Sequence, residues 1–269
     1  MAKNKLAKFA AMATYSNVIQ PALFRKPKDF DGPLPESYPL AEKFLLKGNW
    51  RKDYFHNDNE IVIELGCGKG EYTVELAKRF PNKNFIGVDI KGSRMYTGAT
   101  LAIEAGMSNV AFLRTRIEVI SHFFAENEVD EIWITFPDPQ MKKRSKRMTS
   151  TGFMSQYSKF QKEGGVINLK TDSNFMYTYT KELVKANGLE VIMDTDDLHN
   201  NPVKDDEVNK WLTEITTYYE KQWIARGKSI KYISFRLDKK PLQEPEVEIE
   251  LDDYRSFGRE KRSALNLSK

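Results

Sequence analysis

Cysteine and histidine are scarce in this chain of 269 residues, and long hydrophobic runs are missing from it. The single cysteine, Cys67, excludes an internal disulfide, and three scattered histidines lack the usual spacing of metal ligands, so we expect no metal site. No apolar run approaches the roughly 18 residues that span a bilayer. Lysines interrupt residues 1–17, which argues against a signal peptide and predicts a cytoplasmic location without membrane attachment.

A large excess of one charge is also missing, because 42 basic and 38 acidic residues leave a net charge of only +4. The distribution of these charges is therefore more informative than their sum. Acids gather between residues 190 and 214, while bases gather at the amino terminus, at 142–147 and near the carboxyl end. This segregation favours a nucleic-acid-binding face, and a chance run on a solvated loop is the alternative.

Short apolar runs alternate with helical patterns through the middle of the chain. Such repeated βα units predict an α/β fold with a doubly wound, mostly parallel, seven-stranded sheet whose last strand is antiparallel. The expected strands are 61–65, 84–89, 110–114, 131–136, 165–171, 189–194 and 230–237. The expected helices are 71–80, 93–105, 117–124, 150–162, 174–186 and 205–226.

Three regions follow from this pattern. Residues 41–240 form the α/β domain, and residues 1–40 form a basic, partly helical arm with a proline-rich connector, part of which we expect to be mobile. Residues 241–269 form an acidic and then basic tail that is expected to be flexible. The oligomeric state stays open between monomer and homodimer.

A glycine-rich turn joins the first strand of the domain to its first helix. Gly66, Gly68 and Gly70 permit positive φ and let a ligand approach the backbone at a helix N-terminus. Glu71 takes the place of the third glycine of the dinucleotide fingerprint, so a pyrophosphate would meet a carboxylate there. The turn therefore disfavours NAD and favours an adenosyl ligand without phosphates, such as S-adenosylmethionine.

Two carboxylates accompany this turn. Glu64, near the end of the first strand, could face the cationic amino or sulfonium group of such a ligand, with an ion pair to a neighbouring lysine as the alternative. Asp89 ends the second strand, where a ribose diol would be held, with capping toward Gly92 and Ser93 as the alternative.

A third acid follows the fourth strand. Pro137 ends the strand, and Asp138 then lies between two prolines at the sheet edge where ligands bind in open parallel sheets. The basic run that follows consists of Lys142, Lys143, Arg144, Lys146 and Arg147. An acid beside such a run suggests chemistry on a polyanion, and a simple Pro-Asp-Pro turn is the alternative.

Five motifs, IELGCGKGEY, FIGVDIKGSRM, ITFPDPQMKKR, LKTDSN and TTYYEKQWIARGKSI, together resemble the bacterial tRNA (guanine-N7)-methyltransferase family over residues 60–240. The resemblance implies a class I methyltransferase fold, S-adenosylmethionine as cofactor, and methylation of N7 of guanine 46 in the tRNA variable loop. It implies cofactor contacts for Glu64, the glycine turn and Asp89. For Asp138 it implies the role of active-site acid and a place near the methyl donor. The tRNA-binding residues that it implies are Lys142, Asp172, Thr217, Tyr218, Tyr219 and Glu220.

The chain departs from the family pattern in two places. Arg114–Glu118 stands where relatives often carry an acid for the adenine side, so no contact is carried over there. Gln140 stands where an aromatic residue commonly follows the Pro-Asp-Pro sequence.

Guanine N7 offers a lone pair and no proton, so its methylation needs positioning more than a general base. Asp138 could hold the N1 and N2 donors of the base, and Asp172 is a second candidate with helix capping as its alternative role. Of the adjacent Tyr218 and Tyr219, we expect one to face RNA and the other to be buried.

Three other functions remain open. Methylation of an exocyclic base amine is disfavoured by Gln140, and a Rossmann-type oxidoreductase is disfavoured by Glu71. A non-enzymatic RNA-binding module leaves the acids at three strand ends unexplained.

Overall fold

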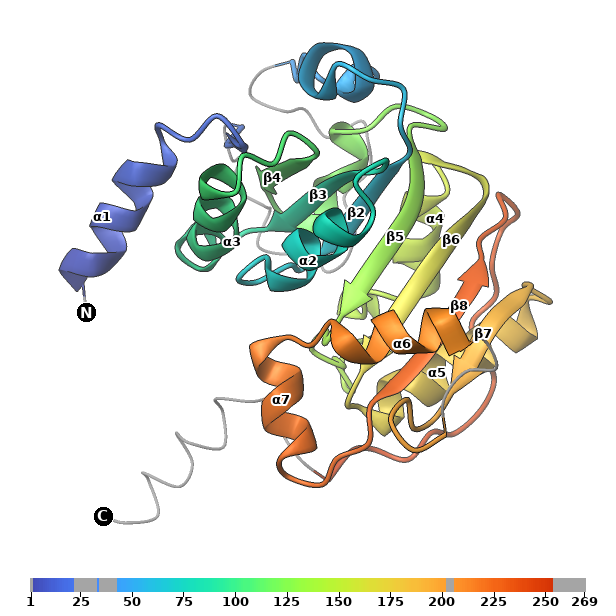
Figure 1. Cartoon of the computed structure of the whole chain (residues 1–269). Helices are drawn as coiled ribbons and strands as arrows, with labels where there is room; N and C mark the ends of the chain where they lie inside the picture. Colours follow the sequence, from blue (N-terminus) through green and yellow to red (C-terminus); the bar gives the residue numbers. More distant parts are fainter. Residues whose placement is uncertain (1, 22–32, 34–42, 202–205, 254–269) are drawn as a thin grey trace.

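Strands that are apolar on both faces require a layer of helices on each side, and this protein has both layers (Figure 1). The computed structural model describes residues 2–21, 33, 43–201 and 206–253. The strands are β1 (Val18–Ile19), β2 (Ile61–Leu65), β3 (Asn84–Asp89), β4 (Val110–Arg114), β5 (Val129–Thr135), β6 (Gln161–Thr171), β7 (Val191–Thr195) and β8 (Lys231–Arg236). The α-helices are α1 (Ala2–Met12), α2 (Glu71–Arg79), α3 (Gly92–Glu104), α4 (Thr151–Tyr157), α5 (Asn174–Ala186), α6 (Asp206–Glu214) and α7 (Tyr218–Ile224).

These strands form one sheet with the order β1-β4-β3-β2-β5-β6-β8-β7. All neighbouring pairs are parallel except those of β8, which lies antiparallel between β6 and β7. The predicted doubly wound α/β sheet with an antiparallel last strand is confirmed. The difference is the short edge strand β1, which comes from the predicted arm and makes the sheet eight-stranded over the described residues.

Alternate residues of each strand face different helical layers. Ile61 and Ile63 of β2 pack in the cluster that includes residues of α4 and α5. Val62 packs with residues of α2 and α3 on the other face, and Glu64 points to this same face, where it contacts Thr73 of α2. Because side chains alternate between the two faces of a strand, the Glu64 carboxylate lies under α2, the helix that follows the glycine turn.

Three predicted helices differ from the observed ones. The helix expected at 150–162 ends at Tyr157, because β6 begins at Gln161 and pairs there with Val129 of β5. The helix expected at 205–226 is two helices, since the Thr217 side chain accepts a hydrogen bond from the amide of Glu220 and starts α7 anew. Residues 117–124 form only a short 3₁₀ segment, Ile117–His122.

The amino-terminal arm begins with helix α1, which packs against the domain. Helix α1 lies beside α3 (Figure 1), with Met12 fully buried and the ring of Phe9 4.8 Å from the guanidinium of Arg114. Val18 then pairs with Phe112 of β4. The connector that we expect to be mobile falls largely on residues 22–32 and 34–42, which lie outside the described residues.

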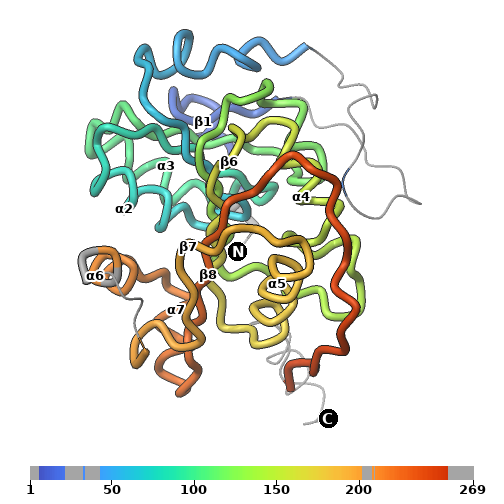
Figure 2. The backbone as a smooth tube through the Cα atoms, turned by 90° about the vertical axis from the view of Figure 1, so that its right-hand side faces the viewer, coloured from blue at the N-terminus to red at the C-terminus, as the bar shows by residue number. Residues whose placement is uncertain are grey.

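Residues 241–253 of the predicted tail pack against the domain. This segment runs along α4 and α5 (Figure 2) and is held there by its acids. Glu244 accepts hydrogen bonds from Thr151 Oγ1 at 2.6 Å and from the hydroxyl of Tyr179 at 2.7 Å. Asp252 accepts one from the amide of Phe175 at 3.0 Å, at the N-terminus of α5. Residues 254–269 are not described.

Candidate active site

The predicted acids meet at one edge of the sheet. Strands β3, β2, β5 and β6 lie side by side, and the carboxyl ends of parallel strands share an edge. Asp89 ends β3, Glu64 lies one residue before the end of β2, and Asp138 and Asp172 follow β5 and β6. Acids from four separate sequence segments therefore lie at the same edge of the sheet.

The glycine turn after β2 has the compact path that its glycines predict. Its φ angles are 79° at Gly66, 56° at Gly68 and 72° at Gly70. A Cβ on Gly70 would lie 2.5 Å from the ring of Phe112, and one on Gly98 of α3 would lie 2.9 Å from the Cα of Gly70. The turn is thus seated on β4 and α3, and larger residues would displace it.

Asp89 supports this turn directly. Its Oδ2 accepts a hydrogen bond from the amide of Gly68 at 3.0 Å, and its Oδ1 accepts one from the amide of Lys91 at 2.7 Å. The alternative of capping toward Gly92 and Ser93 is replaced by this shorter turn to Lys91. A carboxylate has further lone pairs, so Asp89 retains acceptor capacity for a ligand.

Glu64 is buried, with 3% of its surface exposed. It accepts hydrogen bonds from the Thr73 amide at 2.9 Å and from the hydroxyls of Thr73 and Thr135 at 2.5 Å each. The alternative of an ion pair with lysine is not seen among the described residues. Burial raises the pKa of Glu64 to about 7, against the effect of the three hydrogen bonds.

This pKa predicts a pH-dependent stability. A carboxyl group raised from its ordinary pKa of about 4.3 to about 7 stabilises the fold at low pH, and this contribution is lost as pH rises toward 7. Relative to the Glu64→Gln variant, the parent should lose about 2 kcal/mol of unfolding free energy between pH 5 and pH 8. Urea denaturation of both proteins across this range measures it, and parallel pH profiles would contradict it.

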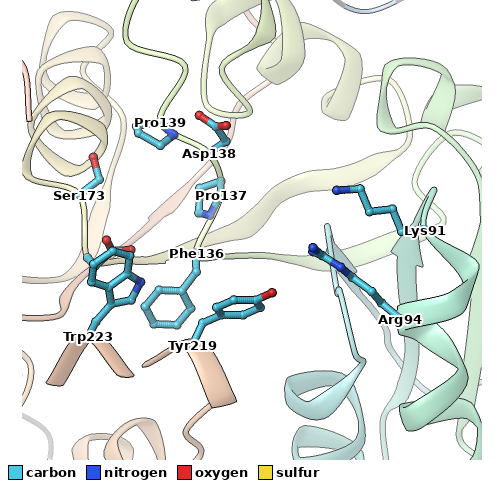
Figure 3. Close-up of a pocket in the computed structure, with 10 residues that line it drawn as sticks. Lys91, Arg94, Phe136, Pro137, Asp138, Pro139, Ser173, Tyr219 and Trp223 are labelled. Carbon is cyan, nitrogen blue, oxygen red and sulfur yellow. The ribbon is translucent and has the colours of Figure 1, made fainter. Parts of the chain in front are cut away.

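Two adjoining cavities lie at this edge, and Figure 3 shows the residues of the larger one. The loop cavity, of about 90 Å³, is bordered by Glu64, residues 66–69 of the glycine turn, Thr135 and Thr217. The edge cavity, of about 250 Å³, is bordered by the residues Lys91, Pro137, Asp138, Pro139, Asp172, Ser173 and Trp223. Arg94, Phe136 and Tyr219 border both cavities. Asp89 borders neither of them.

Asp138 is exposed on a sharply turned backbone. Phe136 and Gln140, on either side, have φ angles of 48° and 47°, which are rare for residues other than glycine. Oδ1 of Asp138 accepts a hydrogen bond from the amide of Gln140 at 3.2 Å, so the turn of the alternative interpretation does exist. The turn also places Asp138 beside the edge cavity, and the two interpretations are therefore compatible (Figure 3).

Asp172 lies deeper, with 8% of its surface exposed. The side chain that caps α5 belongs to Ser173, whose Oγ accepts a hydrogen bond from the amide of Met176 at 2.9 Å. Helix capping therefore does not account for Asp172. Its charge faces Lys231, where it offsets the lowering of that lysine's pKa by burial.

Helix α7 brings one of its two predicted tyrosines into the site. Tyr219 borders both cavities, while Tyr218 is 47% exposed and lies 4.0 Å below the ammonium of Lys69. The expectation that one of them is buried in the core is wrong. Thr217 borders the loop cavity and also caps α7.

Glu220, the last of the predicted tRNA-binding residues, is inside the protein. It is 0% exposed, and its Oε1 lies 2.8 Å from the ammonium of Lys170, which is equally buried. Lys170 also donates to the carbonyls of Leu212 at 2.7 Å and Ile215 at 3.1 Å. Glu220 thus has no surface for RNA here, and it anchors α7 to β6.

The basic run divides into exposed and buried members. Lys142, Lys143 and Arg144 are exposed. Arg147 is 5% exposed, because its guanidinium lies between the rings of Phe175 and Tyr179 at 4.7 and 4.0 Å. It also donates to the carbonyl groups of Pro139, Gln140 and Met141, at 3.4 Å each. Arg147 therefore shapes the Asp138 turn, and the prediction that it lies on the basic surface is wrong.

Several residues of the site were not predicted. Lys91 and Arg94 lie within the motif FIGVDIKGSRM, and their spacing of three residues at a helix start would have placed them on one face next to Asp89. Phe136 and Trp223 looked like core residues in the sequence, and no local signal distinguished them. Among the described residues, no three acids, cysteines or histidines gather as metal ligands would. None of the described helices has both the length and the apolar content of a membrane span.

Comparison with known proteins agrees with this geometry. Residues 58–233 match a family described as "Putative methyltransferase". A tRNA (guanine-N(7)-)-methyltransferase of Bacteroides fragilis is 56% identical over 270 residues, covering 100% of both chains. One from Porphyromonas gingivalis is 57% identical over 234 residues, covering 84% of this chain and 94% of its own. The chain belongs to the tRNA (guanine-N7)-methyltransferase family.

The resemblance based on five motifs is therefore confirmed, and it extends over the whole chain. Solved structures add the fold. A 16S rRNA methyltransferase, KamB, shares 12% identity with a TM-score of 0.52, covering 71% of this chain and 92% of its own. An antibiotic-related methyltransferase has a TM-score of 0.51 at 17% identity, covering 69% of this chain and 90% of its own. The family member described here has the class I methyltransferase fold.

Proposed function

We propose that this protein transfers a methyl group from S-adenosylmethionine to N7 of guanine 46 in the variable loop of tRNA. The observation that carries the proposal is the pair of adjoining cavities at the carboxyl edge of the sheet. One is bordered by the glycine turn and a buried carboxylate, and the other by Asp138, Asp172 and aromatic rings. Full-length similarity to tRNA (guanine-N(7)-)-methyltransferases supports the substrate.

The residues of the loop cavity suit S-adenosylmethionine. A Cβ on Gly68 would meet only the carbonyl of Gly66, at 3.9 Å, so a ligand can lie directly on this backbone. Glu64 would receive the cationic amino group, and Asp89 would hold the ribose diol through its remaining lone pairs. When bound, this cofactor supplies an electrophilic methyl group on a sulfonium.

The protein's own residues then have to position the guanine. Its N7 lone pair needs no base, so holding N7 about 3 Å from the methyl carbon supplies most of the effect. Asp138, and Asp172 as the second candidate, would accept hydrogen bonds from N1 and N2 and stabilise the positive charge that develops on the purine. Tyr219 would stack on the base at the junction of the two cavities. Thr217 would border the bound cofactor at that junction. Glu220 would not contact the substrate, and its ion pair with Lys170 would hold α7 in place.

The exposed basic run would contact tRNA phosphates around the site. Replacing Lys142 and Lys143 by glutamine should weaken tRNA binding and flatten the log-log salt dependence of affinity by up to about two units, because two counterion-releasing contacts are lost. Fluorescence titration with a tRNA transcript at several salt concentrations measures the slope. Lys162→Gln with Lys185→Gln, two bases exposed by 64% and 78%, is the control. An unchanged slope in the first variant would assign the run to a solvated surface.

Three transcripts test the reaction itself. The purified protein, labelled S-adenosylmethionine and a tRNA with guanine 46 should give one methyl group per tRNA, located at that base by nuclease digestion and mass spectrometry. A tRNA with 7-deazaguanine at position 46 retains every other group of the base and should remain unmethylated. A tRNA with adenine at this position should also remain unmethylated. Methylation of the 7-deaza tRNA would assign the reaction to another atom, such as an exocyclic amine.

A further inference from the structure

Two basic side chains form one wall of the edge cavity. Lys91 and Arg94 extend from the start of α3 toward the side on which Phe136 and Tyr219 lie (Figure 3). Both cations are exposed. Lys91 is the N-cap residue of α3, and Arg94 follows it by three positions in the first turn of the helix. Arg94 borders both cavities, whereas Lys91 borders only the edge cavity. The basic wall therefore extends away from the glycine turn.

Within the described residues, these two cations are unpaired. Across the described part of the chain, neither side chain forms a hydrogen bond, an ion pair or a ring contact. Other cations of the same edge are engaged, since Lys69 lies over the ring of Tyr218 and Arg147 lies between two rings. Two neighbouring cations that face a cavity and make no ion pair favour an anionic ligand.

The wall of the edge cavity that faces these cations is acidic and aromatic. Asp138 and Asp172 supply acceptors, and Tyr219 and Trp223 supply rings. A nucleotide matches both walls, because its base carries donors and a π face while its phosphodiester carries an anion. We propose that Lys91 and Arg94 form an oxyanion-binding wall that holds the phosphodiester adjacent to the target guanosine, while the base lies against the acids and rings.

This inference rests on the proposed function and assigns the phosphate side of its substrate site. The carboxylate of the cofactor's methionine portion shares the same oxyanion chemistry. The position of Lys91 favours the phosphodiester, because that lysine does not border the loop cavity. A phosphate held by both side chains would also fix the sugar of the target nucleotide, and hence the direction from which N7 approaches.

A protein–RNA mutant cycle tests the contact. The tRNA is ligated from synthetic halves with a neutral methylphosphonate on the 5′ or the 3′ side of guanine 46, one at a time. Its affinity is measured for the parent, for Lys91→Gln/Arg94→Gln, and for Arg236→Gln as a control arginine at the opposite end of the sheet. Neutralising one of the two phosphates should weaken binding to the parent and to the control about tenfold. The same change should weaken binding to the double variant less than about twofold.

A separate titration with S-adenosylhomocysteine, without RNA, distinguishes the two oxyanions. The double variant should bind this product with parental affinity. A loss of more than about tenfold there, with no coupling to either phosphate, would assign the wall to the cofactor carboxylate and overturn the proposal. Equal losses for all three proteins at both phosphates would overturn it as well. The affinities do not depend on turnover, so failure of the proposed reaction would appear separately in the methylation assay of the parent.

Discussion

Replacing Asp138 by asparagine is expected to lower the single-turnover rate of methyl transfer by about 10²-fold, while the fold and cofactor binding stay intact. Asparagine keeps an oxygen for the hydrogen bond from the Gln140 amide, so the turn at Phe136 and Gln140 can persist. What is lost is a negative charge facing the base while positive charge develops on it.

The measurement uses a tRNA transcript and cofactor, both saturating, so that only steps after binding are seen. Asp238→Asn is a matched control, because Asp238 accepts a hydrogen bond from the amide two residues on, that of Lys240, at 2.9 Å. It follows β8 at the opposite end of the sheet. A parental rate in the Asp138 variant would remove this carboxylate from the mechanism.

The same assay should show little dependence on pH between about 6.5 and 8.5, since no proton is abstracted from N7. Cofactor affinity is a different matter, because in the proposed site the carboxyl group of Glu64, with a pKa of about 7, would have to ionise to receive the cofactor's amino group. The pH dependence is therefore expected in cofactor binding and not in the saturated rate. A bell-shaped saturated rate that becomes flat in Asp138→Asn would instead identify Asp138 as a general base.

The second large effect concerns the buried ion pair of Lys170 and Glu220. Replacing Lys170 by methionine should destabilise the protein by roughly 3–5 kcal/mol, because the Glu220 carboxylate is left in the interior without its cation. Burial already lowers the pKa of Lys170, and Glu220 opposes this shift, so each charge depends on the other. His199 Nε2 lies farther from Glu220 Oε1 than the lysine does, at 3.6 Å.

Urea denaturation of the parent, Lys170→Met, Glu220→Gln and the double variant gives a double-mutant cycle for this ion pair. The double variant should recover much of the lost stability, since neither charge then remains buried alone. The exposed pair Lys78–Glu75, at 2.7 Å, is the control, and its loss should cost under about 1 kcal/mol. Additive losses from Lys170 and Glu220 would show that the pair is not coupled.

Loss of this ion pair should also affect the proposed substrate site. Lys170 holds the carbonyls of Leu212 and Ile215 and the carboxylate of Glu220, so it fixes the position of α7. Tyr219 and Trp223 of α7 border the edge cavity. A loosened α7 would therefore enlarge the cavity that is proposed to hold the base, even though Lys170 borders neither cavity.

The strands and the glycine turn could be predicted from the sequence alone, because their signals are local. The short length of the Ile61–Leu65 run and the glycines that follow it favour a buried strand, and these glycines permit the positive φ angles that the turn requires. Once the strands were placed, the rule that parallel strand ends share an edge brought Glu64, Asp89 and Asp138 together.

Only the tertiary structure decided which charged residues are exposed. Arg147 and Glu220 were predicted to lie on the surface, yet they are buried because their partners come from distant segments. Lys170, the partner of Glu220, is buried as well. The acidic tail read as flexible, yet Glu244 and Asp252 find donors on α4 and α5. The physical reason is that backbone preferences act between neighbours in the chain, whereas desolvation and charge pairing depend on which segments the folded sheet brings together.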